Sequence, residues 1–354
     1  MQERGGIRGL VLLCVGYFAF YIVTGTQVKW FPLHYYGPDV GGEAKTHFLV
    51  DSTIGSSVVV LILVFALRWV RIRSNQVVRL GPLHVPRELL YIIPSGLCLA
   101  VVGPATVLLL SLPISVMVAM VIMRGSVILL CRIIDAIQIR QGLLRKKVLW
   151  EENVAVLIAV LAVATNLFGA SGDDFAFFTD GRAMTLLGAY LGAYGIRLYL
   201  MNYYKNTRKP GAEHDSKAWF AWEQISNTVG FVIIAVVLYV GIRHLGWTDD
   251  RLAAMESAVS RPDWGAIWRT GVPQAASVMF GTLIWLYEGH SATFVGLLNR
   301  LTSLLAGVGA TLLFAVMFGG GYPSVRDWIS VGLIVIAFVF LTRAERRRDD
   351  VAST

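Results

Sequence analysis

Two arginines could do chemistry, because each lies in the middle of an apolar run long enough to cross a bilayer as one helix. Arg124 lies within Ser111–Ile134, and Arg300 lies within Phe294–Phe318. A guanidinium group at that depth costs at least about 2.5 kcal/mol to insert, so it is expected to face a partner or water rather than lipid. Guanidinium groups bind carboxylates and phosphates through two parallel hydrogen bonds. The pair therefore predicts a central site for a small anion.

Polar residues accompany these arginines in the apolar runs and could line the same site. Six of them are candidates for binding a solute: Ser126, Asn299, Thr302, Thr24, Gln27 and Asn227. The alternative is that the arginines lock helices through internal contacts, and that the smaller groups form hydrogen bonds between helices. No acid lies at a comparable depth in the apolar runs. That absence favours an external anion.

Three charged residues nearer the ends of the apolar runs are candidates for gating or coupling. Arg197 and Glu223 lie about one helical turn inside the same predicted boundary, on consecutive helices. This placement predicts a structural or gating salt bridge. The alternative is that Arg197 extends to the lipid headgroups. Glu288, close to His290, could carry a coupling proton or could be an interfacial charge.

The composition is that of a polytopic membrane protein. Of the 354 residues, 56% are hydrophobic and 15% are charged, whereas a soluble domain has about 25% charged residues. The net charge of +8 does not indicate nucleic acid, because the basic residues gather in short loops between apolar runs. Cys14, Cys98 and Cys131 lack metal-ligand spacing, and no catalytic motif is present. We expect no cofactor, no metal site and no enzymatic activity.

The apolar runs predict ten transmembrane helices arranged as two repeats. The runs are Ile7–Val28, Leu49–Val70, Leu89–Leu110, Ser111–Ile134, Asn153–Ala170, Ala183–Tyr203, Trp219–Val240, Trp268–Tyr287, Ser291–Phe318 and Trp328–Leu341. The third and fourth runs meet almost without a loop, and so do the eighth and ninth. Arg124 and Arg300 are 176 positions apart (300 − 124), close to half the chain. We therefore predict an all-α integral membrane protein with two inverted five-helix repeats around a central cavity.

The repeats divide the chain into four segments. Residues 1–205 contain the first repeat and the start of the sixth helix, near residue 183; 206–217 form a polar linker; 183–343 contain the second repeat; and 344–354 form a basic tail. Lys and Arg concentrate on the side of the linker and both ends, which predicts cytoplasmic termini. A short interfacial helix is expected in the outer loop Arg243–Asp263. The small residues of the sixth helix could pack the two halves, or two protomers of a homodimer.

Two stretches resemble a known family of transporters. The likeness is carried by MRGSVILLCRIIDAIQIRQGLLRKKVLWEENVAVLIAVLAVATNLFG and by LLNRLTSLLAGVGATLLFAVMFGGGYPSVRDWISVGLIVIAFVFL. Each is similar to the fourth and fifth helices of a repeat in the drug/metabolite transporter superfamily, which contains EamA-like exporters, nucleotide-sugar transporters and triose-phosphate transporters. The resemblance implies ten helices with cytoplasmic termini, a central cavity and alternating access.

The combined prediction is a secondary transporter that moves a small polar, anionic metabolite across a membrane, the cytoplasmic membrane if the source is a bacterium. Its partners would be the small-molecule substrate and the lipid bilayer, and not nucleic acid. One alternative is an integral-membrane enzyme acting on lipid or glycan, for which Glu288 and His290 are the candidate groups. The other is a non-transporting scaffold or sensor.

Overall fold

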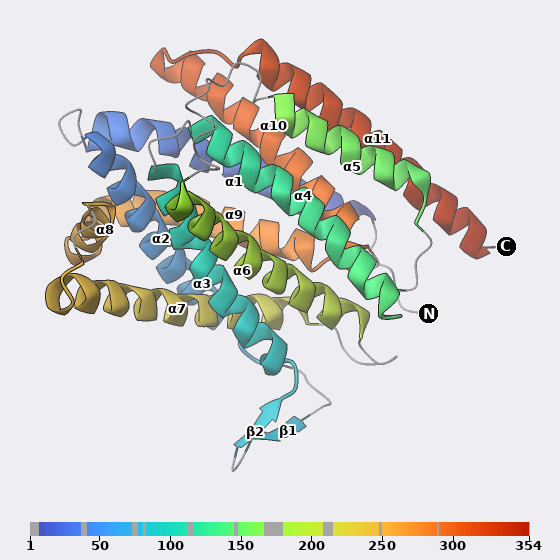
Figure 1. The fold of residues 1–354 in the computed structure, drawn as a ribbon, viewed down its shortest axis with the longest axis horizontal. Helices are drawn as coiled ribbons and strands as arrows, with labels where there is room; N and C mark the ends of the chain where they lie inside the picture. Colours follow the sequence, from blue (N-terminus) through green and yellow to red (C-terminus); the bar gives the residue numbers. More distant parts are fainter. Residues whose placement is uncertain are drawn as a thin grey trace.

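The computed structural model describes residues 7–36, 41–72, 77–80, 83–111, 116–144, 148–165, 180–207, 215–247, 250–288 and 290–353. Within these ranges the chain forms a bundle of α-helices with one short π-helix, η1, and one β-hairpin (Figure 1). The elements are α1 (Ile7–Trp30), η1 (Phe31–Tyr35), α2 (Gly41–Ala66), β1 (Val77–Leu80), β2 (Leu83–Pro86), α3 (Leu89–Ser111), α4 (Val116–Arg140), α5 (Trp150–Ala164), α6 (Gly181–Asn206), α7 (Ser216–His244), α8 (Asp250–Ser260), α9 (Trp264–Trp285), α10 (Ala292–Phe318) and α11 (Val325–Ser353).

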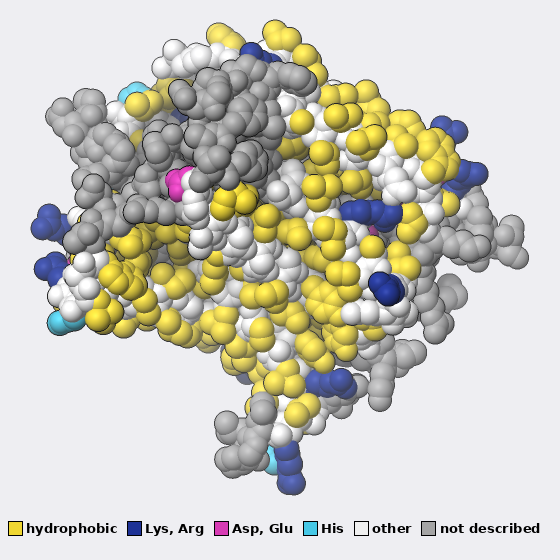
Figure 2. Space-filling view, in the orientation of Figure 1, with side chains coloured by type: hydrophobic (Ala, Val, Ile, Leu, Met, Phe, Trp, Pro, Cys, Tyr) yellow, Lys and Arg dark blue, Asp and Glu magenta, His cyan; other side chains and the backbone are white. Residues whose placement is uncertain are grey.

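The surface of the bundle is apolar where it would meet lipid. On α7, five aliphatic side chains are each more than half exposed: Val229, Val232, Ile233, Val236 and Val237. Figure 2 shows hydrophobic side chains spread across the middle of the visible face, with Lys and Arg mostly toward its edges. An apolar surface this extensive is unfavourable in water and suits a bilayer.

Six of the described helices are long and apolar enough to cross a membrane. They comprise Arg8–Tyr35, Thr46–Ala66, Leu89–Thr106, Ser216–His244, Ala292–Phe318 and Val325–Ala344. The chain is therefore an all-α membrane protein. Two further expected spans, α6 and α9, carry polar groups such as Arg197 and Arg269 that lower their hydropathy. The expected span Asn153–Ala170 extends past residue 165, outside the described residues. The count of ten stays a prediction.

Helix α10 begins in the protein interior and packs against several helices. Every residue from Ser291 to Asn299 is buried, and the helix contacts α1, α4, α9 and α11. Elsewhere glycines allow helix backbones to touch. A Cβ atom at Gly55 of α2 would lie 2.1 Å from the carbonyl oxygen of Ile267 in α9, and Gly271 faces Gly55 directly. Small residues at such crossings allow the dispersion contacts that hold helices together in lipid.

Helices α5 and α11 lie side by side along one edge of the bundle (Figure 1). At one end of the pair, Arg347 Nη1 donates to Glu151 Oε1 at 2.6 Å. At the other end, the hydroxyls of Thr165 and Ser330 lie 2.6 Å apart, and Ser330 also donates to the Ala162 carbonyl at 2.8 Å. The last helices of the two predicted repeats are thus bonded to each other at both ends.

The structure adds three features to the sequence prediction. A hairpin with Val78 opposite Val85 projects from the bundle between α2 and α3, where only a basic loop was expected (Figure 1). Helix α4 continues past Ile134 to Arg140, and α11 continues through the expected tail to Ser353. The short helix expected within Arg243–Asp263 is confirmed as α8, and its place at the outer interface stays a prediction.

Candidate functional site

Arg300 lies on α10, eight residues after its first residue, and its guanidinium group is half-buried inside the bundle. Its Nη2 atom donates to the hydroxyl of Tyr194 at 3.3 Å, and its Cζ atom lies 5.9 Å from the centre of that ring. Its Nε atom is buried without a hydrogen-bond partner. Among the residues that the structure describes, no carboxylate forms an ion pair with it. A half-buried cation is thus bonded to a neutral phenol and keeps an unused donor at Nε.

Tyrosines from two other helices surround this cation. Tyr194 and Tyr190 lie on α6 with their ring centres 5.6 Å apart, and Tyr17 lies on α1. All three interact electrostatically with Arg300. Aromatic faces stabilise a guanidinium group in place of water, and phenol hydroxyls can donate to an oxyanion. The arrangement can therefore bind an anion without first breaking an internal salt bridge.

Arg124 lies on α4, but its side chain is outside the part that the structure describes. The helix itself is placed next to α10: a Cβ atom at Gly296 would lie 2.7 Å from Cys131 Sγ. Arg124 lies before Cys131 on α4, and Arg300 lies after Gly296 on α10. The structure thus brings together the two helices that carry the arginines, and the joint clamp stays a prediction.

The smaller candidate residues occupy several different places. Ser126 is half-buried on α4, and Asn299 is buried beside Arg300. Thr302 is buried and donates to the Leu298 carbonyl of its own helix at 2.9 Å. These three lie on the helices of the arginines, as their sequence positions require.

The other three candidates make contacts between or within helices. Thr24 donates to the Phe20 carbonyl and lies 3.3 Å from the Ser277 hydroxyl, so it joins α1 to α9. Gln27 donates to the Arg269 carbonyl at 2.9 Å. Asn227 is buried on α7 with its Oδ1 atom lacking a hydrogen bond. The alternative of bonds between helices therefore describes Thr24 and Gln27 in this structure.

Arg197 and Glu223 form a buried ion pair between α6 and α7. Nε and Nη2 of the arginine each donate to one carboxylate oxygen at 3.0 Å, and the Ser95 hydroxyl of α3 donates to Glu223 Oε1 at 2.5 Å. The two side chains are 4% and 0% exposed, which excludes contact of this arginine with headgroups. Three helices are thereby joined through one carboxylate. The gating role of the pair stays a prediction.

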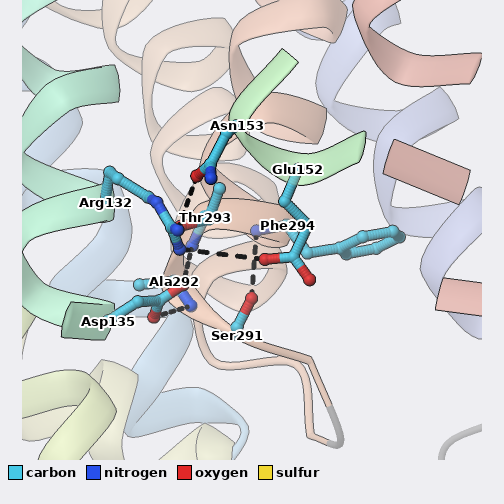
Figure 3. A network of polar contacts seen from close by, with 8 residues as sticks. All are labelled: Arg132, Asp135, Glu152, Asn153, Ser291, Ala292, Thr293 and Phe294. Atoms are coloured by element: carbon cyan, nitrogen blue, oxygen red, sulfur yellow. Dashed lines mark hydrogen bonds and ion pairs between the residues drawn. The ribbon is translucent and has the colours of Figure 1, made fainter. Parts of the chain in front are cut away.

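A polar network at the beginning of α10 was not anticipated from the sequence (Figure 3). The Asp135 carboxylate of α4 accepts from the backbone N–H groups of Ala292 and Thr293, both at 3.0 Å. Ser291 Oγ accepts from the Phe294 N–H at 3.4 Å. Unpaired N–H groups and the helix dipole both favour an anion at this position. The sequence signal was an acid directly after the predicted end of the fourth span at Ile134.

The same network ties α4 to α5. Arg132 Nη2 donates to Asn153 Oδ1 at 2.6 Å, and Arg132 Nη1 lies 3.8 Å from Glu152 Oε2 (Figure 3). Glu152 is fully buried. These groups join the carboxyl-terminal half of α4 to the first turn of α5 and so position the two helices.

Lys205 binds the connection between α9 and α10 from the side of α6. Its Nζ atom donates to the carbonyls of Trp285 at 3.0 Å and His290 at 3.4 Å. Glu288 is half-buried in this connection and interacts electrostatically with Lys205, and the His290 ring stacks on Phe294 with centres 4.4 Å apart. The predicted neighbours Glu288 and His290 are therefore parts of a structural junction.

No group of three or more His, Cys, Asp or Glu side chains in the described ranges is placed to hold a metal ion. Around Arg300 the observed contacts are suited to binding by charge and hydrogen bonds. The main group is the Arg300 guanidinium within the tyrosines of α1 and α6.

Comparison with known proteins bears on the fold. No model of a protein family matches the chain, and no curated protein matches it. Twenty-one chains of solved structures match, one of them a crystal structure of a protein 14% identical to this chain. The likeness covers 96% of this chain and 98% of that chain, with a TM-score of 0.54. Nearly the whole chain therefore has an architecture already seen in solved structures, and at this identity the likeness concerns the fold alone.

Proposed function

We propose that this protein is a secondary transporter that carries a small anionic metabolite across a membrane by alternating access, with the fold of the drug/metabolite transporter superfamily. The apolar helices support a place in the bilayer. We further propose that ten helices cross the membrane, that both termini are cytoplasmic and that the two halves are inverted repeats.

The pattern of helix contacts supports the repeats. Let α1 correspond to α6, α2 to α7, α3 to α9, α4 to α10 and α5 to α11. The contacts of α1 with α9 and α10 then match those of α6 with α3 and α4, and the contact of α2 with α9 matches that of α7 with α3. The contact of α4 with α5 likewise matches that of α10 with α11. A duplicated bundle with this exchange symmetry is the arrangement recurrent in secondary transporters.

The proposal depends mainly on Arg300, which has no carboxylate partner among the described residues and an Nε atom without a hydrogen bond. Desolvating an ionised group is costly, and proteins usually offset that cost with an opposite charge. Here the described surroundings supply a phenol oxygen instead, and Nε is left without a hydrogen bond. A scaffold gains nothing from such a residue, whereas a carrier needs a cation that an anionic solute can bind and leave.

The test is flux through purified protein in liposomes. Vesicles loaded with unlabelled monocarboxylate, dicarboxylate or sugar phosphate are given the labelled compound outside, and one class is expected to show saturable counterflow. Arg300→Ala should lower that flux about 10- to 100-fold, because hydrogen bonds to charged groups contribute about 1.5–3 kcal/mol. Arg140→Ala, at the exposed end of α4, is the matched control and should leave flux unchanged.

Two results would reject the proposal. One is the absence of counterflow for every anion class in vesicles that contain folded protein. The other is equal flux in the wild type and in the Arg124→Ala, Arg300→Ala double variant, which would reject the anion site while leaving transport in place.

A further inference from the structure

Two lysines occupy equivalent positions in the two halves of the chain. Lys29 and Lys205 are 176 positions apart, the same separation as Arg124 and Arg300 (205 − 29 = 300 − 124). Lys29 lies next to the last residue of α1, and Lys205 lies next to the last residue of α6. The two helices correspond in the proposed repeats. Each lysine is half-buried, and each reaches across to another helix.

The neighbours of the two lysines correspond as well. Lys205 interacts electrostatically with Asp135 of α4. The position equivalent to Asp135 in the second half is Thr311 of α10 (135 + 176). Lys29 Nζ donates to the Thr311 hydroxyl at 2.9 Å. Both lysines therefore interact with equivalent positions of corresponding helices, Lys205 electrostatically with an acid and Lys29 through a hydrogen bond to a threonine.

Lys205 and Lys29 differ in the number of hydrogen bonds that they form. Lys205 donates to two backbone carbonyls, at 3.0 Å and 3.4 Å, and has an acid nearby. Lys29 forms one hydrogen bond to a neutral hydroxyl, lies 5.9 Å from the centre of the Phe314 ring and interacts electrostatically with Asp327. Among the described residues, it donates to no carbonyl. Lys205 itself is thus held by more hydrogen bonds than Lys29.

The lysines mark opposite ends of α10, with Arg300 between them. Lys205 holds the connection that leads into Ala292, and Lys29 holds Thr311. At a rise of 1.5 Å per residue, the nineteen-residue separation along α10 spans about 28 Å, close to the thickness of the hydrocarbon core. Arg300 lies about 12 Å along this length from Ala292. The two lysines therefore lie on opposite sides of Arg300 along the length of α10.

We propose that Lys205 and Lys29 are matched latches that hold the two ends of the bundle shut in alternation, and that the structure has the Lys205 end latched. The proposal rests on the transport function proposed above. When Lys205 releases the connection between α9 and α10, that end opens and the contact of Lys29 with α10 tightens. Release of Lys29 has the opposite effect. Each half of the chain thus contributes one lysine latch.

Hydrogen–deuterium exchange of the full chain in lipid nanodiscs tests the latches without a substrate. Lys205→Met should speed amide exchange about tenfold in the first turn of α10, the low end of the effect of losing a hydrogen bond from a charged donor. It should also slow exchange in the last two turns of α10, around Thr311 and Phe314. Lys29→Met should produce the reverse pattern. Lys205→Arg keeps donors at the junction and should stay close to wild type.

The reciprocal change is the decisive result, because an ordinary structural bond affects only its own end. Faster exchange confined to the mutated end, or no change at either end, would overturn the proposal. Lys217→Met, which removes an exposed lysine over the Trp69 ring, is the matched control and should alter neither end. If Lys205→Met does not fold, Lys29→Met tests the same reciprocity from the other end. Absence of flux would refute the transport function even where exchange is reciprocal, whereas flux without reciprocity would refute the latches alone.

Discussion

Breaking the Arg197–Glu223 pair should destabilise the protein strongly. Glu223 accepts three hydrogen bonds, two from Arg197 and one from Ser95, and neither charged side chain is more than 4% exposed. Removing one partner of such a pair leaves a buried charge without compensation and costs about 3–5 kcal/mol. Glu223→Leu is therefore expected to lower the melting temperature in detergent by about 4–7 °C, since an unfolding entropy of about 2.1 cal/mol/K per residue makes 1 kcal/mol correspond to about 1.3 °C in a chain of 354 residues.

A double-mutant cycle separates the ion pair from mere loss of packing. Arg197→Met should cost about as much as Glu223→Leu, whereas the double variant should recover most of the loss, because apolar groups of similar volume can replace a buried pair. The expected coupling is about 3 kcal/mol. Additive losses in the double variant would refute this account. If the pair also gates, the double variant will recover its melting temperature without recovering counterflow.

Three further predictions concern the ends and crossings of helices. Asp135→Ala should speed exchange in the first turn of α10, because two N–H groups lose their acceptor at a cost of about 1–2 kcal/mol; an unchanged first turn would contradict the capping role. Gly271→Ala should prevent α2 and α9 from packing and lower the melting temperature, whereas Gly307→Ala, with open space at its Cβ, should raise it slightly. Partial burial raises the pKa of Asp263, the residue that caps α9, but hydrogen bonds from Ala266, Tyr35 and Gly265 together hold that pKa below its usual value. The carboxylate therefore stabilises the fold above pH of about 4 and loses this effect as the pH falls through its lowered pKa; thermal melts from pH 3 to 6 should show the loss in the wild type and a smaller loss in Asp263→Asn.

Helices were the most predictable part of the structure, because the free energy of inserting a segment into lipid depends mainly on its composition. Equal depth on consecutive helices was also enough to suggest that Arg197 would meet Glu223. The tyrosines around Arg300 could not be found in this way. Tyrosine gives no signal of which face of a helix points inward, since its apolar ring and polar hydroxyl suit both the protein interior and the membrane interface.

Contacts between segments far apart in the chain could not be predicted from the sequence, for a related reason. Asp135 caps a helix that begins 157 residues later, and Lys205 binds backbone carbonyls, which every residue offers. Only the arrangement of the helices determines which carbonyls lie within reach. The hairpin between α2 and α3 was missed because its short strands lie among charged residues that favoured a loop.

The bonded pair of α5 and α11 constrains how the bundle can change shape. Ties at both ends, Glu151 with Arg347 and Thr165 with Ser330, prevent these helices from sliding or separating unless hydrogen bonds break. If the protein is the transporter proposed above, opening of either end is expected to be a rotation of the other helices about the α5–α11 pair. Spin labels on α5 and α11 should then keep a constant separation when substrate is added, while labels on the remaining helices move relative to that pair.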